Sequence, residues 1–169
     1  MRDLHEILRG GYCTRWHANP DLAHVRETLA EHHARVAQIL LALHPSPSRH
    51  LLDAALHHDA GEPECGDLPG PFKVAHPEIA AAHAACEARR LVELGCPPNL
   101  SETELRWLKM ADRLAAYAHV AHVRPDLLGR FGWREMLAEV VAQAWQLGCE
   151  VEVEVLIARL APQLIVGEA

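Results

Sequence analysis

Apolar residues recur at intervals of three and four residues along most of this chain, between short runs of proline and glycine. From residue 28 to residue 43 they mark one face of a helix, and the Pro-Ser-Pro-Ser segment at 45–48 ends the pattern. Period-two alternation, which is typical of a strand, occurs at residues 150–155, but leucines at helical spacing follow it directly. The sequence therefore predicts an all-α fold, a single helical bundle of about six helices.

Local signals place the ends of these helices. The clearest start is Ser101, because Ser101 and Glu104 have the spacing of a capping box. Glycine and proline between residues 61 and 71 predict a long loop after the second helix, which carries His58 and Asp59 at its end. The predicted helices cover residues 28–43, 49–59, 77–94, 101–119, 134–147 and 150–164.

The composition limits which classes of protein the chain can belong to. Its 169 residues are typical of one domain, with half of them hydrophobic and a formal net charge of -7. That charge argues against a nucleic-acid-binding protein, because such proteins present a basic face to the phosphate backbone. The five cysteines form no CxxC pair, and no apolar run has the length of a signal or a membrane span, so we expect free thiols and a cytoplasmic protein.

Polar residues stand at three places on otherwise apolar helix faces. Asp112 falls at helical spacing from apolar residues on both sides, so helical geometry directs its carboxylate towards the buried side. His32 has the same relation to its apolar neighbours, and the His58-Asp59 pair follows an apolar stripe at the end of its helix. His33, next to one of these positions, is interpreted as an ordinary helix-face residue.

Buried carboxylates need compensating charge. An unpaired buried carboxylate costs several kcal/mol, so two of them predict a cation nearby. Two imidazole nitrogens and two carboxylate oxygens suit a divalent ion such as Co, Mn, Mg, Ni or Zn, and their spacing does not choose among these metals. A metal with open coordination positions can lower the pKa of bound water and polarise a phosphoryl oxygen, as hydrolysis of a phosphate ester requires. The alternative interpretation is a hydrogen-bonded polar network inside a helical bundle.

Five short motifs occur in an order that is similar to a known family. They are Arg-Trp at 15–16, Glu-His at 31–32, His-His-Asp-Ala-Gly-Glu at 57–62, Gly-Asp-Leu-Pro-Gly-Pro-Phe-Lys at 66–73 and Lys-Met-Ala-Asp at 109–112. A single histidine, then an adjacent His-Asp pair, then a distant aspartate resembles the HD-domain phosphohydrolase family. The flanking motifs resemble its 5′-deoxynucleotidase branch, and the similarity covers roughly residues 15 to 118.

The resemblance implies roles for the residues that match the family motifs. As its metal ligands it implies His32, His58, Asp59 and Asp112. Glu62 would orient the attacking water or carry its proton, which is physically reasonable for a carboxylate near a cation. Asp67, on the same loop, would assist in catalysis.

The resemblance also implies contacts with the substrate. Arg15 and Lys73 would bind phosphate oxygens, and so provide local positive charge on an acidic protein. Trp16 would pack against the sugar and occupy the space that a 2′-hydroxyl needs, which favours deoxyribose. Pro71 and Phe72 would line the pocket for the base.

The resemblance leaves the substrate open between two kinds of enzyme. A compact phage branch with similar Arg-Trp, His-Asp and Pro-x-Lys elements releases triphosphate from deoxynucleoside triphosphates, notably dATP. This chain is similar to that branch in its small size, and its segment between Asp59 and Asp112 is shorter than in the monophosphate-specific enzymes. A third, non-enzymatic hypothesis is a metal-storing or ligand-sensing protein, which would need the metal ligands but not Glu62.

The expected partners follow from these hypotheses. The ligand is a small-molecule deoxynucleotide, handled with a divalent metal ion as cofactor and without a nucleic-acid or membrane partner. Apolar and aromatic side chains on the last two predicted helices could also support a homo-oligomer, a dimer or larger.

Overall fold

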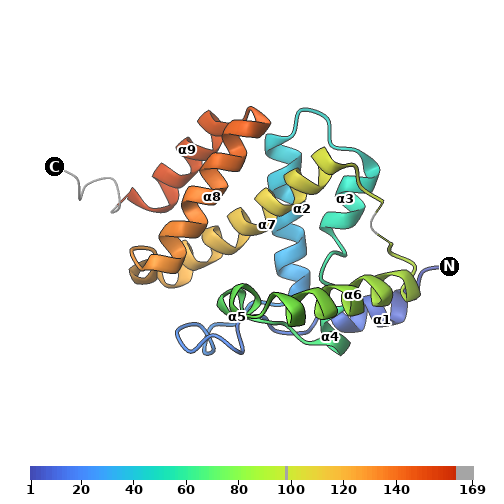
Figure 1. Ribbon diagram of the computed structural model, residues 1–169. Coiled ribbons are helices and arrows are strands. Elements are labelled where there is room, and N and C mark those ends of the chain that lie inside the picture. Colours follow the sequence, from blue (N-terminus) through green and yellow to red (C-terminus); the bar gives the residue numbers. More distant parts are fainter. Residues whose placement is uncertain (98, 163–169) are drawn as a thin grey trace.

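The computed structural model describes residues 1–97 and 99–162, and over these ranges the chain is built from helices (Figure 1). The all-α prediction is confirmed there, because the described residues form nine α-helices and one 3-10 helix, with a lone β-bridge between Thr14 and Thr28. The elements are α1 (Leu4–Gly10), α2 (Leu29–Leu43), α3 (Arg49–Ala55), α4 (Glu62–Cys65), α5 (Gly70–Ala75), α6 (Pro77–Glu93), α7 (Glu102–Val123), the 3-10 helix η1 (Pro125–Leu127), α8 (Phe131–Leu147) and α9 (Glu150–Leu160).

Each of the six predicted helices is present, and the short helices α1, α4 and α5 were not predicted. The last two lie in the expected long loop, where Pro63 and Pro71 stand in the first turn of a helix instead of ending one. Proline fits the first turn because an amide hydrogen has no intrahelical partner there. The prediction that the second helix reaches residue 59 is wrong, since α3 ends at Ala55 and leaves His58 and Asp59 in the turn beyond it.

The segment that alternates with period two is helical, as predicted, and forms the start of α9. Its apolar residues continue at helical spacing to Leu160. The longer helical pattern therefore outweighs the short alternating one. The predicted end of this helix at residue 164 lies outside the described residues.

The core forms where α7, the longest described helix, packs against α2, α3, α8 and α9. Figure 1 shows α7 running across α2, with α8 and α9 on one side and α3 on the other. Fully burying an aliphatic side chain contributes about 1.5–3 kcal/mol, so the shared cluster fixes how these helices pack. Its members include Val36, Leu40, Leu51, Ala55, Leu108, Leu114, Val140 and Val153.

Capping boxes fix where the two central helices begin. Thr28 accepts the amide of Glu31, and the Glu31 carboxylate accepts the amide of Thr28 at the start of α2. The predicted capping box of Ser101 and Glu104 starts α7 in the same way. Each cap is worth about 1 kcal/mol, and His32, near the start of α2, is completely buried.

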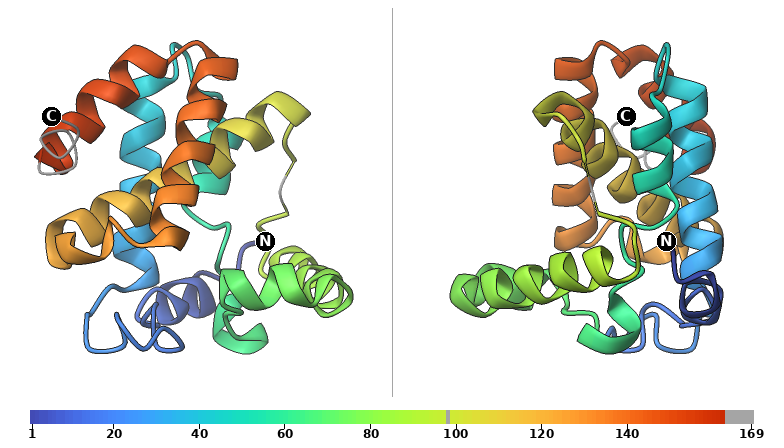
Figure 2. Two further views of the ribbon diagram at one scale, coloured as in Figure 1. Left: turned by 60° about the vertical axis from the view of Figure 1, so that its left-hand side comes forward. Right: turned by 90° about the vertical axis from the view of Figure 1, so that its right-hand side faces the viewer.

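A second group of helices lies at one end of this core. In both views of Figure 2, α6 runs beside α4 and α5, away from the crossing of α2 and α7. Only Leu91 is buried along α6, and α4 and α5 bury none of their residues. Among the described residues, no helix combines the length and apolar character that crossing a membrane would require.

Candidate metal centre

Side chains from three separate elements converge where the start of α2 lies near the middle of α7. His32 comes from α2, His58 and Asp59 from the turn after α3, and Asp112 from the middle of α7. His32, His58 and Asp59 offer ligand atoms that all lie within 4.8 Å of one another, a group that could hold a metal ion. These four residues are the ligands that the sequence predicts, and in the structure their side chains contact one another.

The two imidazoles each lie near both carboxylates, although Asp112 is outside the group of three that meets the 4.8 Å limit. His32 Nε2 lies 3.3 Å from His58 Nε2, 3.0 Å from Asp112 Oδ1 and 3.7 Å from Asp59 Oδ2. His58 Nε2 lies 3.3 Å from Asp59 Oδ2 and 3.7 Å from Asp112 Oδ1. Two imidazole nitrogens and two carboxylate oxygens at such separations match the mixed donor set that borderline divalent ions accept.

Local backbone structure orients the His-Asp pair. After α3 ends, the amides of His57 and Ala60 donate to carbonyls three residues back, and the amide of Glu62 donates to the carbonyl of Asp59 at 3.0 Å. His58 Nδ1 lies 3.1 Å from the carbonyl oxygen of Ala55 and can donate to it. When His58 is neutral, that bond places its proton on Nδ1 and leaves the lone pair of Nε2 directed towards the other ligand atoms, which is the tautomer that a metal requires.

Exposure differs across the centre. The His32 side chain is completely buried, whereas the side chains of Asp59 and Asp112 are 19% and 37% exposed. The sequence predicts that Asp112 points to the buried side, but the structure leaves part of its carboxylate open to solvent. An ion at this point would therefore be held from the interior by the imidazoles and approached from the side of the carboxylates.

Ion pairs and burial set the charge of the cluster. Burial disfavours charge on His58, but Asp59 and Asp112 outweigh burial and raise the pKa of His58 to about 9. Burial by itself would raise the pKa of Asp112, yet hydrogen bonds with His32 and His58 hold that pKa well below its ordinary value. Burial lowers the pKa of His32 despite its contact with Asp112. One protonated imidazole thus offsets only one of the two carboxylate charges, whereas a divalent cation would offset both.

His33, interpreted from the sequence as an ordinary helix-face residue, is buried beside the centre. The side chain is buried, and its ring lies 4.9 Å from the ring of His58 between centroids. Burial, followed by the charges of His58 and His32, lowers the pKa of His33 to about 2. His33 is therefore a neutral packing partner of the ligand His58, which only the tertiary structure reveals.

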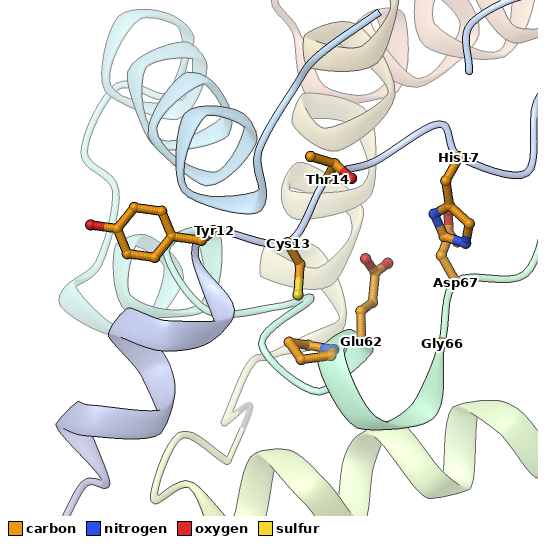
Figure 3. A pocket seen from close by; sticks show the side chains of 8 residues that line it. Tyr12, Cys13, Thr14, His17, Glu62, Gly66 and Asp67 are labelled. Atoms are coloured by element: carbon orange, nitrogen blue, oxygen red, sulfur yellow. The ribbon is translucent and has the colours of Figure 1, made fainter. Parts of the chain in front are cut away.

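A cavity of about 440 Å³ lies between the loop after α1 and the turn around α4 (Figure 3), and none of the four predicted metal ligands is among its lining residues. In Figure 3 the Glu62 carboxylate points from α4 towards the segment that carries Cys13 and Thr14. Burial, then the charges of Asp59 and Asp67, raises the pKa of Glu62 to about 9. The lining residues are Tyr12, Cys13, Thr14, His17, Glu62, Pro63, Gly66 and Asp67.

The predicted catalytic residues and one predicted phosphate contact are near this cavity. Glu62 and Asp67 both line it, and the amide of Glu62 links its wall to Asp59. Arg15 lies on the adjacent loop, and its charge counts among those that lower the pKa of Glu62 and of His32. The structure thus brings together the acids, the metal ligands and one basic side chain.

The other predicted substrate contacts lie elsewhere. Trp16 is half-buried and not among the lining residues, and its indole N–H donates to Glu27 at 2.6 Å. Pro71, Phe72 and Lys73 lie on α5 and are not among the lining residues. The Phe72 ring packs against His76 with centroids 4.6 Å apart, and the charge of Lys73 acts on Glu87. The roles assigned to these residues in binding base, sugar and phosphate stay predictions.

Comparison with protein-family models, with curated proteins and with solved structures finds no match for this chain. Its function therefore has to be argued from the geometry of the centre and the cavity.

Proposed function

We propose that this chain is a divalent-metal-dependent phosphohydrolase of the HD-domain kind that acts on 2′-deoxynucleoside 5′-phosphates. The observation that carries the proposal is the convergence of His32, His58, Asp59 and Asp112 from three elements. Asp112 contacts both imidazoles, as it would in a polar network, but the side chains of Asp59 and Asp112 stay partly exposed. An ion from solvent can therefore reach the donor atoms of the cluster.

The four side chains would hold the ion, and the neighbouring acids would act on the attacking water. When bound, a divalent ion supplies water of lowered pKa and polarises a phosphoryl oxygen. Glu62 reaches into the cavity from α4, where its carboxyl group would hydrogen-bond to that water and orient it. Because burial raises its pKa to about 9, it would take up the proton of the water only where the charge of a bound ion lowers that pKa. Asp67, on the same wall, would assist by holding Glu62 or the water in place.

Local charge supports a monophosphate as the substrate. The net charge of the chain is -7, so a phosphate group has to be met by a basic side chain at the site itself. Arg15 is the cation among the main charges that act on Glu62, whereas Lys73 acts on Glu87. A triphosphate carries more negative charge and would need more cations than Arg15 and one metal ion provide. The cavity of about 440 Å³ falls in the range of small-ligand sites.

One assay tests the proposal. The protein is stripped of metal, reloaded separately with Mn, Co, Ni, Zn or Mg, and incubated with dAMP and with dATP. We expect orthophosphate from dAMP with at least one of the metals. Triphosphate released from dATP would instead support the triphosphohydrolase, and metal binding without turnover of either nucleotide would support the storage or sensor hypothesis.

A sugar comparison sharpens the same assay. If Trp16 favours deoxyribose, dAMP should be hydrolysed faster than AMP under identical conditions, and Trp16→Ala should reduce that ratio. The cytoplasmic location and the homo-oligomer remain predictions. For the latter, Phe131 and Trp145 on α8 and Val151 on α9 are exposed apolar side chains that a second copy could cover.

A further inference from the structure

Glu27 is a buried acid for which the proposed chemistry has no role. Its side chain is 0% exposed, and it lies just before α2, after the loop that carries Arg15 and Trp16. It is not one of the grouped metal ligands, and it does not line the cavity beside Glu62. A buried carboxylate is costly unless charged and hydrogen-bonding partners surround it, so its partners indicate what it does.

The Glu27 carboxylate is shared among side chains from different parts of the chain. Its Oε2 accepts the indole N–H of Trp16 at 2.6 Å, and its Oε1 pairs with the guanidinium of Arg35 on α2. His119 of α7 places Nδ1 at 3.7 Å from Oε1. Arg15 donates its amide to the carbonyl of Glu27 at 2.8 Å, and its Nη1 lies 3.9 Å from Oε2. Glu27 thus joins the Arg15-Trp16 loop to α2 and α7.

These contacts hold Trp16 in an unfavourable backbone conformation. Its φ is 67°, in the left-handed region, where a bulky side chain is uncommon and costs of order 1–3 kcal/mol. The bond to Glu27 offsets that cost, and the indole lies parallel to the His119 ring with centroids 6.3 Å apart. The conformation also places the neighbours of this short segment, Thr14 and His17, on the wall of the cavity.

Arg15 is held in place, but one of its guanidinium nitrogens has no hydrogen-bond partner within the described part of the chain. Its guanidinium lies over the Trp16 ring, 5.2 Å from the centroid, and its side chain is 14% exposed. The separation of 3.9 Å between Nη1 and Glu27 is too long for a hydrogen bond, and Nη1 is a buried atom with no hydrogen-bond partner among the described residues. A buried guanidinium nitrogen with a spare donor is suited to an oxyanion.

We propose that Glu27 is a positioning residue, which fixes Trp16 and Arg15 so that the Arg15 guanidinium is presented to the phosphate group of the substrate. The inference rests on the proposed function for the identity of that ligand, and it assigns to Glu27 a task that neither metal binding nor proton transfer covers. Glu27 acts through Arg15 and Trp16 and does not touch the substrate itself.

The decisive variant is Glu27→Gln in the manganese-loaded full chain, with inorganic phosphate as the probe in a calorimetric titration. Loss of a negative charge near Arg15 would by Coulomb's law alone tighten phosphate binding. Positioning predicts the opposite sign, because a neutral amide holds Arg15 and Trp16 less firmly. We expect the Kd for phosphate to rise about tenfold, with unchanged manganese content.

Two further variants make the test specific. Trp16→Phe keeps the ring and removes the indole N–H, so it should also weaken phosphate binding, and the double variant should be little worse than Glu27→Gln alone because both act through one contact. Glu31→Gln is the matched control, since it removes an exposed negative charge from the start of the same helix and glutamine preserves the capping box. Its phosphate affinity should equal that of the wild type.

Turnover of dAMP gives a second readout. Glu27→Gln should raise KM about tenfold and leave kcat within about threefold, as expected when binding that is common to ground and transition state is lost. A role in stability alone would lower the melting temperature and leave the affinity of the folded protein unchanged. If Glu27→Gln does not fold, the phosphate affinity of Trp16→Phe tests the positioning role in its place.

The outcomes separate the inference from the proposed function. Wild-type protein that binds phosphate but hydrolyses neither nucleotide would refute the phosphohydrolase, while weakened phosphate binding by Glu27→Gln would still support positioning. Unchanged or tighter phosphate binding in both Glu27→Gln and Trp16→Phe would overturn the positioning role. A wild type that turns over dAMP without measurable phosphate affinity would be judged on KM alone, and an unaltered KM in both variants would likewise overturn it.

Discussion

The metal centre and the cavity wall are linked through the bond from Glu62 to Asp59, but different kinds of contact hold the two regions in place. His32, Asp112 and the turn after α3 belong to elements that pack in the main core, where α7 contacts α2 and α3. Glu62 and Asp67 lie on or beside α4, a four-residue helix without a buried residue. Helices this short are not stable by themselves in water. The ligands are therefore held by core packing, and the acids by a few local contacts.

Mutations in the core and mutations in the cavity wall should therefore change different properties of the protein. Polar contacts tie the cavity wall to α6: Arg90 pairs with Glu64 at 2.6 Å, and His83 lies 2.8 Å from the carbonyl oxygen of Gly66. Opening of such a region costs less than global unfolding. Changes in the core should therefore affect stability and metal together, whereas changes at the wall should affect turnover and leave both largely intact.

The largest effect is expected from Asp112→Asn. The substitution removes the carboxylate that lies 3.0 Å from His32 and 3.7 Å from His58, so the protein should lose most of its manganese and all measurable hydrolysis. Metal content after dialysis, measured by mass spectrometry, checks this. Asp126→Asn, at an exposed acid in η1, is the control and should retain the ion. Full metal content in Asp112→Asn would show that the site does not use this residue.

Glu62→Gln should separate chemistry from metal binding. We expect kcat to fall by about 100-fold to 10,000-fold, the usual contribution of a positioned acid or base, with wild-type manganese content and melting temperature. Glu64→Gln, on the same short helix but exposed, should keep most of the turnover. A Glu62→Gln enzyme with full activity would remove Glu62 from the mechanism and favour a different water-positioning group.

Core and wall should also differ in their contribution to stability. Leu40→Ala removes a completely buried side chain from the cluster that joins α2 to α7, and should lower the free energy of unfolding by about 2–5 kcal/mol. Val92→Ala on α6, at a side chain that is 61% exposed, should change it by less than about 0.5 kcal/mol. Denaturant titrations of the two variants compare them. Similar losses would mean that α6 is part of the cooperative core.

The smallest effect concerns acid stability at the start of α7. A hydrogen bond from Ser48, then those from the amide and hydroxyl of Ser101, lower the pKa of Glu104 to about 2 from its ordinary 4.5. Since the folded pKa is the lower one, this stabilisation is complete above pH 4.5 and is lost as the pH falls from 4.5 towards 2. Glu104→Gln should therefore show a shallower loss of stability over that interval, measured by urea unfolding at several pH values. A slope equal to that of the wild type would contradict the assignment.

Much of the centre could be predicted because its signals are local. His32 and Asp112 are recognisable as polar interruptions of apolar helix faces, and the capping box at Ser101 and Glu104 fixes the start of the helix that carries Asp112. Residues three or four positions apart lie on the same face of a helix, so a polar residue at that spacing from apolar ones can be predicted to point inward. The failures are local as well, since Pro63 and Pro71 indicated a loop where each begins a short helix.

Glu27, His33 and Arg15 show what the sequence could not supply. Glu27 follows a loop and precedes a helix, and its burial depends on Arg35 and on His119, a residue of α7 more than 90 positions later in the chain. No periodicity marks such a residue, because its environment comes from segments that are distant in the chain. The packing of α5 against α6, which lets the charge of Lys73 act on Glu87, is a tertiary result of the same kind.

The sequence by itself determined the helical class, the principal helices and the identity of the metal-binding candidates, because each depends on interactions within a few residues. Only the tertiary structure decided that His32, His58, Asp59 and Asp112 meet, that Glu62 faces a cavity and that Glu27 holds Trp16. Their meeting depends on how α2, α3 and α7 pack. That arrangement is set by the summed burial of many apolar side chains, which no single stretch of sequence contains.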